Sequence, residues 1–274
     1  MPKTVIAPLQ IGQAQTVSAS TVENILKYEP ENIETGCKCS SFGTRLASGR
    51  LRAETSFSST EAGGWTSRAR SGLTLQAGEE KRKTFIVVGI VERGGSTLYC
   101  TALFISDQGE VVAKHRKVLP TASERLIWGR GDASTLPLVK TPAGLAGAAI
   151  CWENYMPSYA TPCTPKASDL VRAHGGRKGH LAESMKHISY EGRHIPGERM
   201  PVPASSLGRD DCSFGAPGGV GRPCVRQEAL LKAEIDLDDI IRARYDMDVV
   251  GHYARPDIFQ LVVDEKPKNS MDCQ

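Results

Sequence analysis

Two β-rich runs with a short link between them constrain the fold of this chain most. The runs span residues 84–92 (TFIVVGIVE) and 97–106 (TLYCTALFIS), and Arg93-Gly94-Gly95-Ser96 joins them. A glycine-containing link of this length between two such runs is typical of a β-hairpin. We therefore predict a hairpin over residues 84–106.

Further strand and helix patterns follow this hairpin. Residues 111–119 form a third candidate strand, and the apolar run 145–152 predicts a buried strand that ends at a cysteine. We predict a strand over residues 228–237 and a short helix over residues 238–247, because acidic residues at the start of the helix and arginines later match its dipole. Strands interleaved with helices predict an α/β or α+β layered sandwich.

The length of 274 residues is enough for one large domain, and we predict a single α/β domain over residues 1–274. A formal charge of +3 is too small to indicate a nucleic-acid partner. The first 20 residues lack a continuous apolar core and no later stretch is long enough to cross a bilayer, so we expect a cytoplasmic protein with no membrane partner. The eight cysteines are expected to be reduced thiols, and none has the CxxC spacing of a zinc site.

Three segments have no sustained hydrophobic period. Residues 35–78, 158–181 and 194–226 are rich in Arg, Gly, Ser, Ala and Pro, and this composition predicts loops or disorder. Loops of that length are uncommon inside a compact domain. Their presence is therefore unusual for a simple layered fold.

The first chemical motif is the cysteine at which the apolar run 145–152 ends. Cys151 opens the sequence CWENYMP, and a nucleophile placed where a buried strand turns into the next element is held rigidly. The alternative is that Cys151 is a small core residue, which is the commoner role of a cysteine after an apolar strand.

A second motif combines cations, a carboxylate and a tryptophan at the end of the third candidate strand. His115-Arg116-Lys117 is followed by Glu124 and by the sequence WGRGD from Trp128. A lysine near a cysteine lowers the pKa of the thiol and stabilises the negative charge of a tetrahedral adduct. Taken alone, the three basic residues would also fit a solvated strand end.

Together these motifs resemble the nitrilase branch of the carbon–nitrogen hydrolase superfamily. The resemblance covers about half of the chain, mainly residues 83–157, 182–193 and 227–264. It implies a four-layer α-β-β-α sandwich and a Glu-Lys-Cys triad, in which Cys151 is the nucleophile and Lys117 the electrostatic stabiliser. Glu124 matches a second, supporting glutamate.

The resemblance also implies a reaction. The thiolate attacks a small-molecule nitrile to give a thioimidate, one water releases ammonia, and a second water frees the carboxylic acid. No metal or organic cofactor is required, and a homo-oligomer is expected. A cyanide hydratase or nitrile hydratase activity, which releases the amide, is an alternative on the same scaffold.

The chain departs from the family at the first member of the triad. The family carries this general-base glutamate in a Phe-Pro-Glu-Ala motif after the second strand, and the chain has no such motif. Glu61 resembles its tail only faintly and lies too close to the strand at residues 84–92, so we do not assign it the role. Without a general base the thiol lacks its proton acceptor, which predicts a weakly active or inactive enzyme.

The similarity also stops after Pro157 and resumes at Ala182. Suitable codons for the intervening residues, read one base out of frame, give family-like sequence, and codons for Gly43-Thr44 can contain a glutamate codon. We therefore hypothesise frameshifts, which would leave the sandwich incomplete. A catalytically inactive nitrilase-like remnant, or a basic binding module built on the Arg-rich segments, are the alternatives from other functional classes. Glu92 and His252 are expected to be structural.

Overall fold

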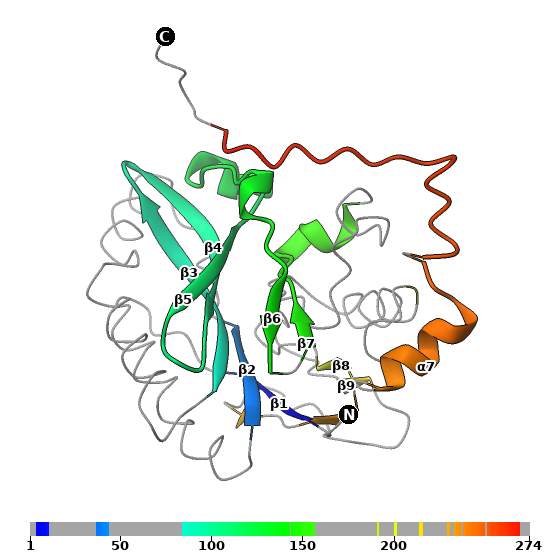
Figure 1. Cartoon of the computed structure of the whole chain (residues 1–274). Coiled ribbons are helices and arrows are strands. Elements are labelled where there is room, and N and C mark those ends of the chain that lie inside the picture. Colours follow the sequence, from blue (N-terminus) through cyan, green and yellow to red (C-terminus); the bar gives the residue numbers. More distant parts are fainter. Residues whose placement is uncertain are drawn as a thin grey trace.

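The structure is a computed structural model of the chain (Figure 1). It describes residues 4–10, 37–43, 84–142, 144–156, 191, 200–201, 214–215, 229–230, 233–236, 238–249 and 251–268.

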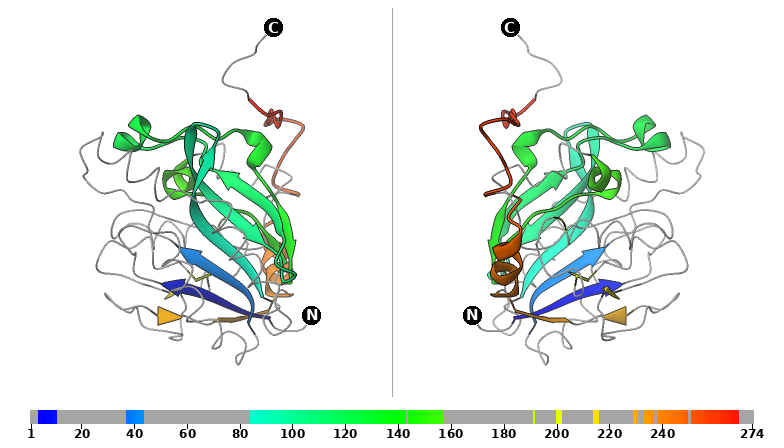
Figure 2. Two further views of the ribbon diagram at one scale, coloured as in Figure 1. Left: turned by 90° about the vertical axis from the view of Figure 1, so that its left-hand side faces the viewer. Right: turned by 90° about the vertical axis from the view of Figure 1, so that its right-hand side faces the viewer.

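The main feature is a mixed seven-stranded sheet in the order β10-β1-β2-β3-β4-β5, with β11 also paired to β1. Its strands are β1 (Thr4–Gln10), β2 (Cys37–Gly43), β3 (Phe85–Gly94), β4 (Thr97–Ile105), β5 (Val111–Arg116), β10 (Ala229–Leu230) and β11 (Ala233–Ile235). β2 runs parallel to both β1 and β3, whereas all other pairs are antiparallel. In the side views of Figure 2, β1 and β2 cross the lower part of the molecule and β3–β5 rise above them, so the sheet is strongly twisted.

The smaller elements complete the described part of the chain. They are the two-stranded sheets β6 (Val139–Thr141) with β7 (Gly144–Ala146) and β8 (Met200–Pro201) with β9 (Phe214–Gly215), the 3-10 helices η1 (Ala122–Leu126), η2 (Ala133–Thr135) and η3 (Cys151–Tyr155), and the helix α7 (Asp238–Asp246). The run 251–268 after α7 is largely exposed and reaches back across the molecule, where the Lys268 amide donates to Asp132 (Figure 1, red). No helix among the described residues is long and apolar enough to cross a membrane.

The predicted hairpin is confirmed. β3 and β4 pair antiparallel up to Gly94 opposite Thr97, which leaves a two-residue loop of Gly95 and Ser96. Gly95 has a φ of 64°, and a glycine with positive φ at the first loop position is what a type II′ hairpin turn requires. β4 lies between β3 and β5 and is buried continuously from Cys100 to Ile105, which explains its unbroken apolar run.

The predicted strand over residues 111–119 ends earlier than expected. β5 stops at Arg116, because the backbone of the next residue bonds to two different segments. The Lys117 amide donates to the Cys100 carbonyl, whereas the Lys117 carbonyl accepts from the Gly131 amide, each at 2.8 Å. The chain therefore leaves the sheet at Lys117.

The prediction of one strand over residues 145–152 is largely wrong. Only β7 is a strand, and it pairs with β6 as far as Val139 opposite Ala146. In that register Pro137 would lie opposite Ala148, and a proline has no amide with which to continue the ladder. Residues 148–150 are nevertheless buried, as predicted, and lead directly to Cys151.

The prediction of loops over residues 35–78 is wrong at β2, which is an inner strand of the sheet. The sequence of β2, CKCSSFG, shows no apolar alternation, so its strand structure depends on its two neighbours rather than on its own pattern. The predicted strand over 228–237 appears in two pieces, β10 and β11, and the predicted helix over 238–247 is confirmed by α7. Within the other predicted loops only β8 and β9 are described.

Candidate active site

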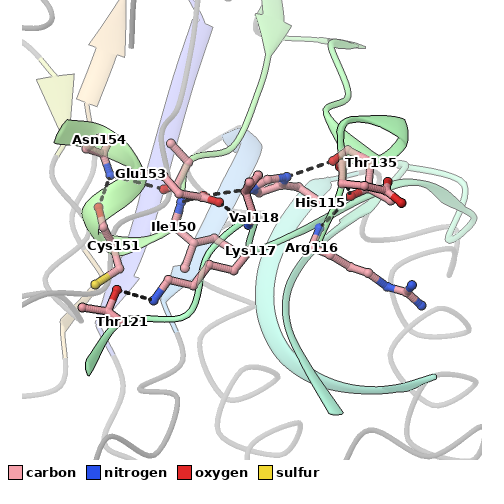
Figure 3. A network of polar contacts seen from close by, with 12 residues as sticks. His115, Arg116, Lys117, Val118, Thr121, Thr135, Ile150, Cys151, Glu153 and Asn154 are labelled. Carbon is pink, nitrogen blue, oxygen red and sulfur yellow. Dashed lines mark hydrogen bonds and ion pairs between the residues drawn. The ribbon is translucent and has the colours of Figure 1, made fainter. Parts of the chain in front are cut away.

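Cys151 lies at a sharp turn of the chain. Ile150 before it is extended, with φ −103° and ψ 121°, whereas Cys151 has a φ of 58° and begins η3. A positive φ is uncommon for a residue other than glycine and indicates local strain. The Asn154 side-chain amide donates to the Cys151 carbonyl at 2.9 Å and so supports the turn (Figure 3). The Cys151 side chain remains half-buried.

Lys117 supplies a buried cation to this turn. Its side chain is 2 % exposed, and its ammonium donates to a Glu124 carboxylate oxygen at 2.5 Å and to the Thr121 hydroxyl at 3.3 Å. The same Glu124 oxygen accepts from the Thr121 amide at 2.8 Å at the start of η1, so the carboxylate is fixed from two sides. In Figure 3 the Lys117 side chain extends toward Thr121, and the Cys151 sulfur lies beside them.

The pKa values of Cys151 and Lys117 are coupled. Burial raises the pKa of the Cys151 thiol, and the positive charge of Lys117 opposes this only in part. Burial by itself would lower the pKa of Lys117, but the hydrogen bond to Glu124 and the attraction of Cys151 raise it. Lys117 is therefore charged at neutral pH while Cys151 is a neutral thiol, which needs a proton acceptor before it attacks.

Glu153 connects the two segments that carry Lys117 and Cys151. Its side chain is 1 % exposed. One carboxylate oxygen accepts from the Val118 amide at 2.6 Å, and the other accepts from the Ile150 amide at 2.5 Å and contacts His115 Nε2 at 2.8 Å. The fully buried His115 ring contacts the Thr135 carbonyl through Nδ1, also at 2.8 Å. The sequence motifs contain both residues but give no indication of this network.

The cations that the sequence groups together lie on opposite faces of β5. His115 and Lys117 face the Cys151 turn, whereas Lys114 and Arg116 bind Glu92 on β3, as the alternation of side chains along a strand requires. Arg116 contacts Glu92 through two nitrogens and lies over the Tyr99 ring at 4.0 Å. These contacts support the expected structural role of Glu92.

The Glu92 cluster predicts an acid-sensitive contribution to stability. Burial by itself would raise the pKa of Glu92, but hydrogen bonds from Arg116, Lys114 and Thr101 outweigh it and lower the pKa from 4.5 to about 2. A depressed pKa stabilises the fold above pH 4.5, and the contribution disappears as the pH falls from 4.5 toward 2. We expect Glu92→Gln to lower the free energy of unfolding at pH 7 by about 1–3 kcal/mol. Urea unfolding at pH 7, 4 and 3 measures this, and a deficit that does not shrink with falling pH would contradict it.

The WGRGD motif, residues 128–132, packs against the start of β4 and the end of β5. Trp128 is buried and forms a bridge with Leu98, whose carbonyl also accepts from the Gly129 amide. A Cβ atom at Gly131 would lie 2.2 Å from the Arg116 carbonyl oxygen, which no side chain tolerates. This close approach allows the Gly131 amide to reach the Lys117 carbonyl.

Gly131→Ala is therefore expected to move the end of β5 and to lower the free energy of unfolding by about 1–3 kcal/mol. Gly95→Ala is the matched control, because a Cβ there meets no atom within 4 Å and costs only the strain of a φ of +64°, roughly 1 kcal/mol. Chemical denaturation of both variants checks the difference. An equal loss of stability in the two would show that the contact with Arg116 is unimportant.

The structure thus brings Cys151, Lys117 and Glu124 together. Glu61, which matches the general-base motif only faintly, lies outside the described residues. His252 is exposed and packs edge-on against Tyr253. In the described part of the chain, no three His, Cys, Asp or Glu side chains cluster in a way that could hold a metal ion.

Comparison with known proteins shows which family the chain belongs to. The sequence profile described as "Carbon-nitrogen hydrolase" matches residues 61–245. The chain is 42 % identical over 215 residues to an aliphatic nitrilase of Sinorhizobium fredii (68 % of this chain, 67 % of that protein) and 39 % identical over 226 residues to a nitrilase of Bradyrhizobium diazoefficiens (72 % and 68 %). The matched region thus spans about two thirds of the length of these relatives.

The fold is similar to solved structures at low sequence identity. Saccharomyces cerevisiae Nit3, described as a member of branch 10 of the nitrilase superfamily, has a TM-score of 0.69 at 15 % identity, covering 92 % of this chain and 96 % of Nit3. The Caenorhabditis elegans NitFhit protein has a TM-score of 0.73 at 16 % identity, covering 98 % of this chain and 69 % of that one. The predicted nitrilase-like α/β fold is confirmed. Among the elements that the structure describes, α7 is the only α-helix, and the other helices are short 3-10 helices.

The family profile and the relatives together define the chain as a carbon–nitrogen hydrolase, an enzyme family that acts on carbon–nitrogen bonds. Within that family it belongs to the nitrilase branch, since its relatives at about 40 % identity are nitrilases.

Proposed function

We propose that this protein hydrolyses a small-molecule nitrile to a carboxylic acid and ammonia, with Cys151 as the nucleophile. The observation that carries the proposal is the half-buried thiol at a strained turn beside the buried ammonium of Lys117. The sequence similarity to proteins named as nitrilases supports the choice of nitrile as substrate.

Cys151, Lys117 and Glu124 have different roles in the proposed reaction. The sulfur of Cys151 attacks the nitrile carbon while its proton passes to nitrogen, which gives a thioimidate. Addition of water and loss of ammonia leave a thioester, and a second water releases the acid and restores the thiol, so two waters are consumed for each nitrile. Lys117 stabilises the negative charge that develops at each addition, and Glu124 holds the ammonium in place.

The general base stays unassigned in this proposal. Because the pKa of Cys151 is raised, a chain without that base is expected to turn over slowly. The frameshift hypothesis would account for the missing glutamate. Sequencing the transcript across codons 35–78 and 157–182 tests it, and an unshifted transcript would contradict it. A cytoplasmic homo-oligomer, forming one domain over residues 1–274, completes the proposal.

The decisive assay incubates folded protein with a panel of small aliphatic and aromatic nitriles. Ammonia release is quantified, and mass spectrometry separates acid from amide products. Acid and ammonia in equal amounts support the proposal, and amide as the main product would instead support the hydratase alternative. Folded protein that releases neither product would contradict both.

A further inference from the structure

The buried carboxylate of Glu153 joins the end of β5 to the Cys151 turn. His115 belongs to β5, Val118 follows Lys117, and Ile150 precedes Cys151. The two amide donors are thus the immediate neighbours of the two residues that must meet (Figure 3). A side chain with these three contacts fixes the distance between the β5 end and the Cys151 turn.

Hydrogen-bond geometry defines the net charge of the Glu153–His115 pair. His115 Nδ1 faces the Thr135 carbonyl, which only accepts, so Nδ1 carries a hydrogen. The contact between Nε2 and the Glu153 oxygen then holds one further proton, either on the ring nitrogen or on the oxygen. The pair is neutral overall in both cases. The charge of the Glu153 carboxylate by itself raises the pKa of Cys151, so a role in making the thiol reactive must come from geometry.

We propose that Glu153, supported by His115, is a positioning residue that holds the Cys151 sulfur within the field of the Lys117 ammonium. This inference rests on the proposed function, because it assigns Glu153 a role in making the same thiol reactive. Glu153 does not itself touch the reacting atoms. It acts through the Ile150 and Val118 amides.

Two substitutions of Glu153 separate geometry from charge. In Glu153→Gln the side-chain amide can accept from Val118, but its NH₂ group then faces the Ile150 amide, so two donors oppose each other and the turn must shift. In Glu153→Asp the charge is kept, but the side chain is one methylene too short to reach both amides. Both variants therefore loosen the turn, whereas only the first removes a carboxylate.

The test measures the rate at which iodoacetamide alkylates Cys151 as a function of pH, with peptide mass spectrometry to distinguish this thiol from the other seven. Because Lys117 lowers the pKa of Cys151, a displaced turn is expected to shift the alkylation midpoint upward by roughly half a unit or more in both variants. Where nitrile turnover is measurable, kcat is expected to fall about tenfold or more with KM within about threefold. Glu92→Gln is the matched control, since Glu92 is also ion-paired but binds Lys114 and Arg116 on the face of β5 opposite to the Cys151 turn, and neither quantity should change.

Two outcomes would overturn the inference. An unchanged midpoint in folded variants would make Glu153 only a stabilising residue. A lower midpoint in Glu153→Gln together with an unchanged one in Glu153→Asp would show that its charge, not its geometry, acts on the thiol. Alkylation needs no nitrile turnover, so an inactive wild-type chain would refute the proposed function and still leave this inference decided by the midpoints. If Glu153→Gln fails to fold, Glu153→Asp alone distinguishes an upward shift from none.

Discussion

Cys151→Ala is expected to abolish ammonia release from every nitrile that the wild-type chain hydrolyses, a loss of at least about 10³-fold. Removal of the sulfur eliminates the thioimidate, and no other described side chain occupies its place. The half-exposed position of Cys151 on η3 predicts little change in stability, so the variant should unfold close to the wild-type midpoint. Ammonia assays at substrate saturation, with urea unfolding on the same preparations, measure both effects.

Cys100→Ala is the control for this experiment. Cys100 is also a free thiol, but it is buried in β4, and burial raises its pKa well above the usual range. Its substitution is expected to lower stability by about 1 kcal/mol through a small cavity and to leave catalysis in place. Equal loss of activity in both variants would contradict the assignment of Cys151 as the nucleophile. Residual ammonia release by Cys151→Ala would also refute this assignment.

The part of the fold that could be predicted from the sequence is the part with local pairing. β3 and β4 are adjacent in the chain, and their apolar residues and the glycine at the turn all agree with a hairpin. β1 and β2 could not be predicted, because their parallel pairing depends on partners far along the chain. β1 also contains Pro8, which argues against an inner strand, and β2 has no apolar alternation.

The candidate site shows the same division. The motifs identify Lys117, Glu124 and Cys151, and the fold brings them together. Glu153 could not be identified, because a glutamate two residues after a cysteine is usually exposed, and only the tertiary structure turns it inward to meet His115. The positive φ of Cys151 could not be predicted from the sequence either, since cysteine does not favour this backbone conformation.

Lys117→Met provides the second large effect, because methionine has nearly the same length without the charge. Loss of the ammonium removes the group that lowers the pKa of Cys151 and stabilises the negative charge of the adduct, while Glu124 nearby continues to raise that pKa. We expect kcat/KM to fall by about 10²–10³-fold. The alkylation midpoint of Cys151 should move to higher pH, whereas no shift is expected if Lys117 is only a steric support.

Measuring the stability of Lys117→Met distinguishes a loss of electrostatic catalysis from general damage to the fold. Lys117 is buried, whereas its partner Glu124 is 24 % exposed and keeps the Thr121 amide as a donor. Replacing a buried cation by an apolar side chain of similar size is often neutral or stabilising, so Lys117→Met should unfold at or above the wild-type urea midpoint. Glu124→Ala should instead lose about 2–4 kcal/mol, because it leaves the buried ammonium with only the Thr121 hydroxyl. A Lys117→Met variant that is both destabilised and unaltered in alkylation midpoint would contradict an electrostatic role for Lys117.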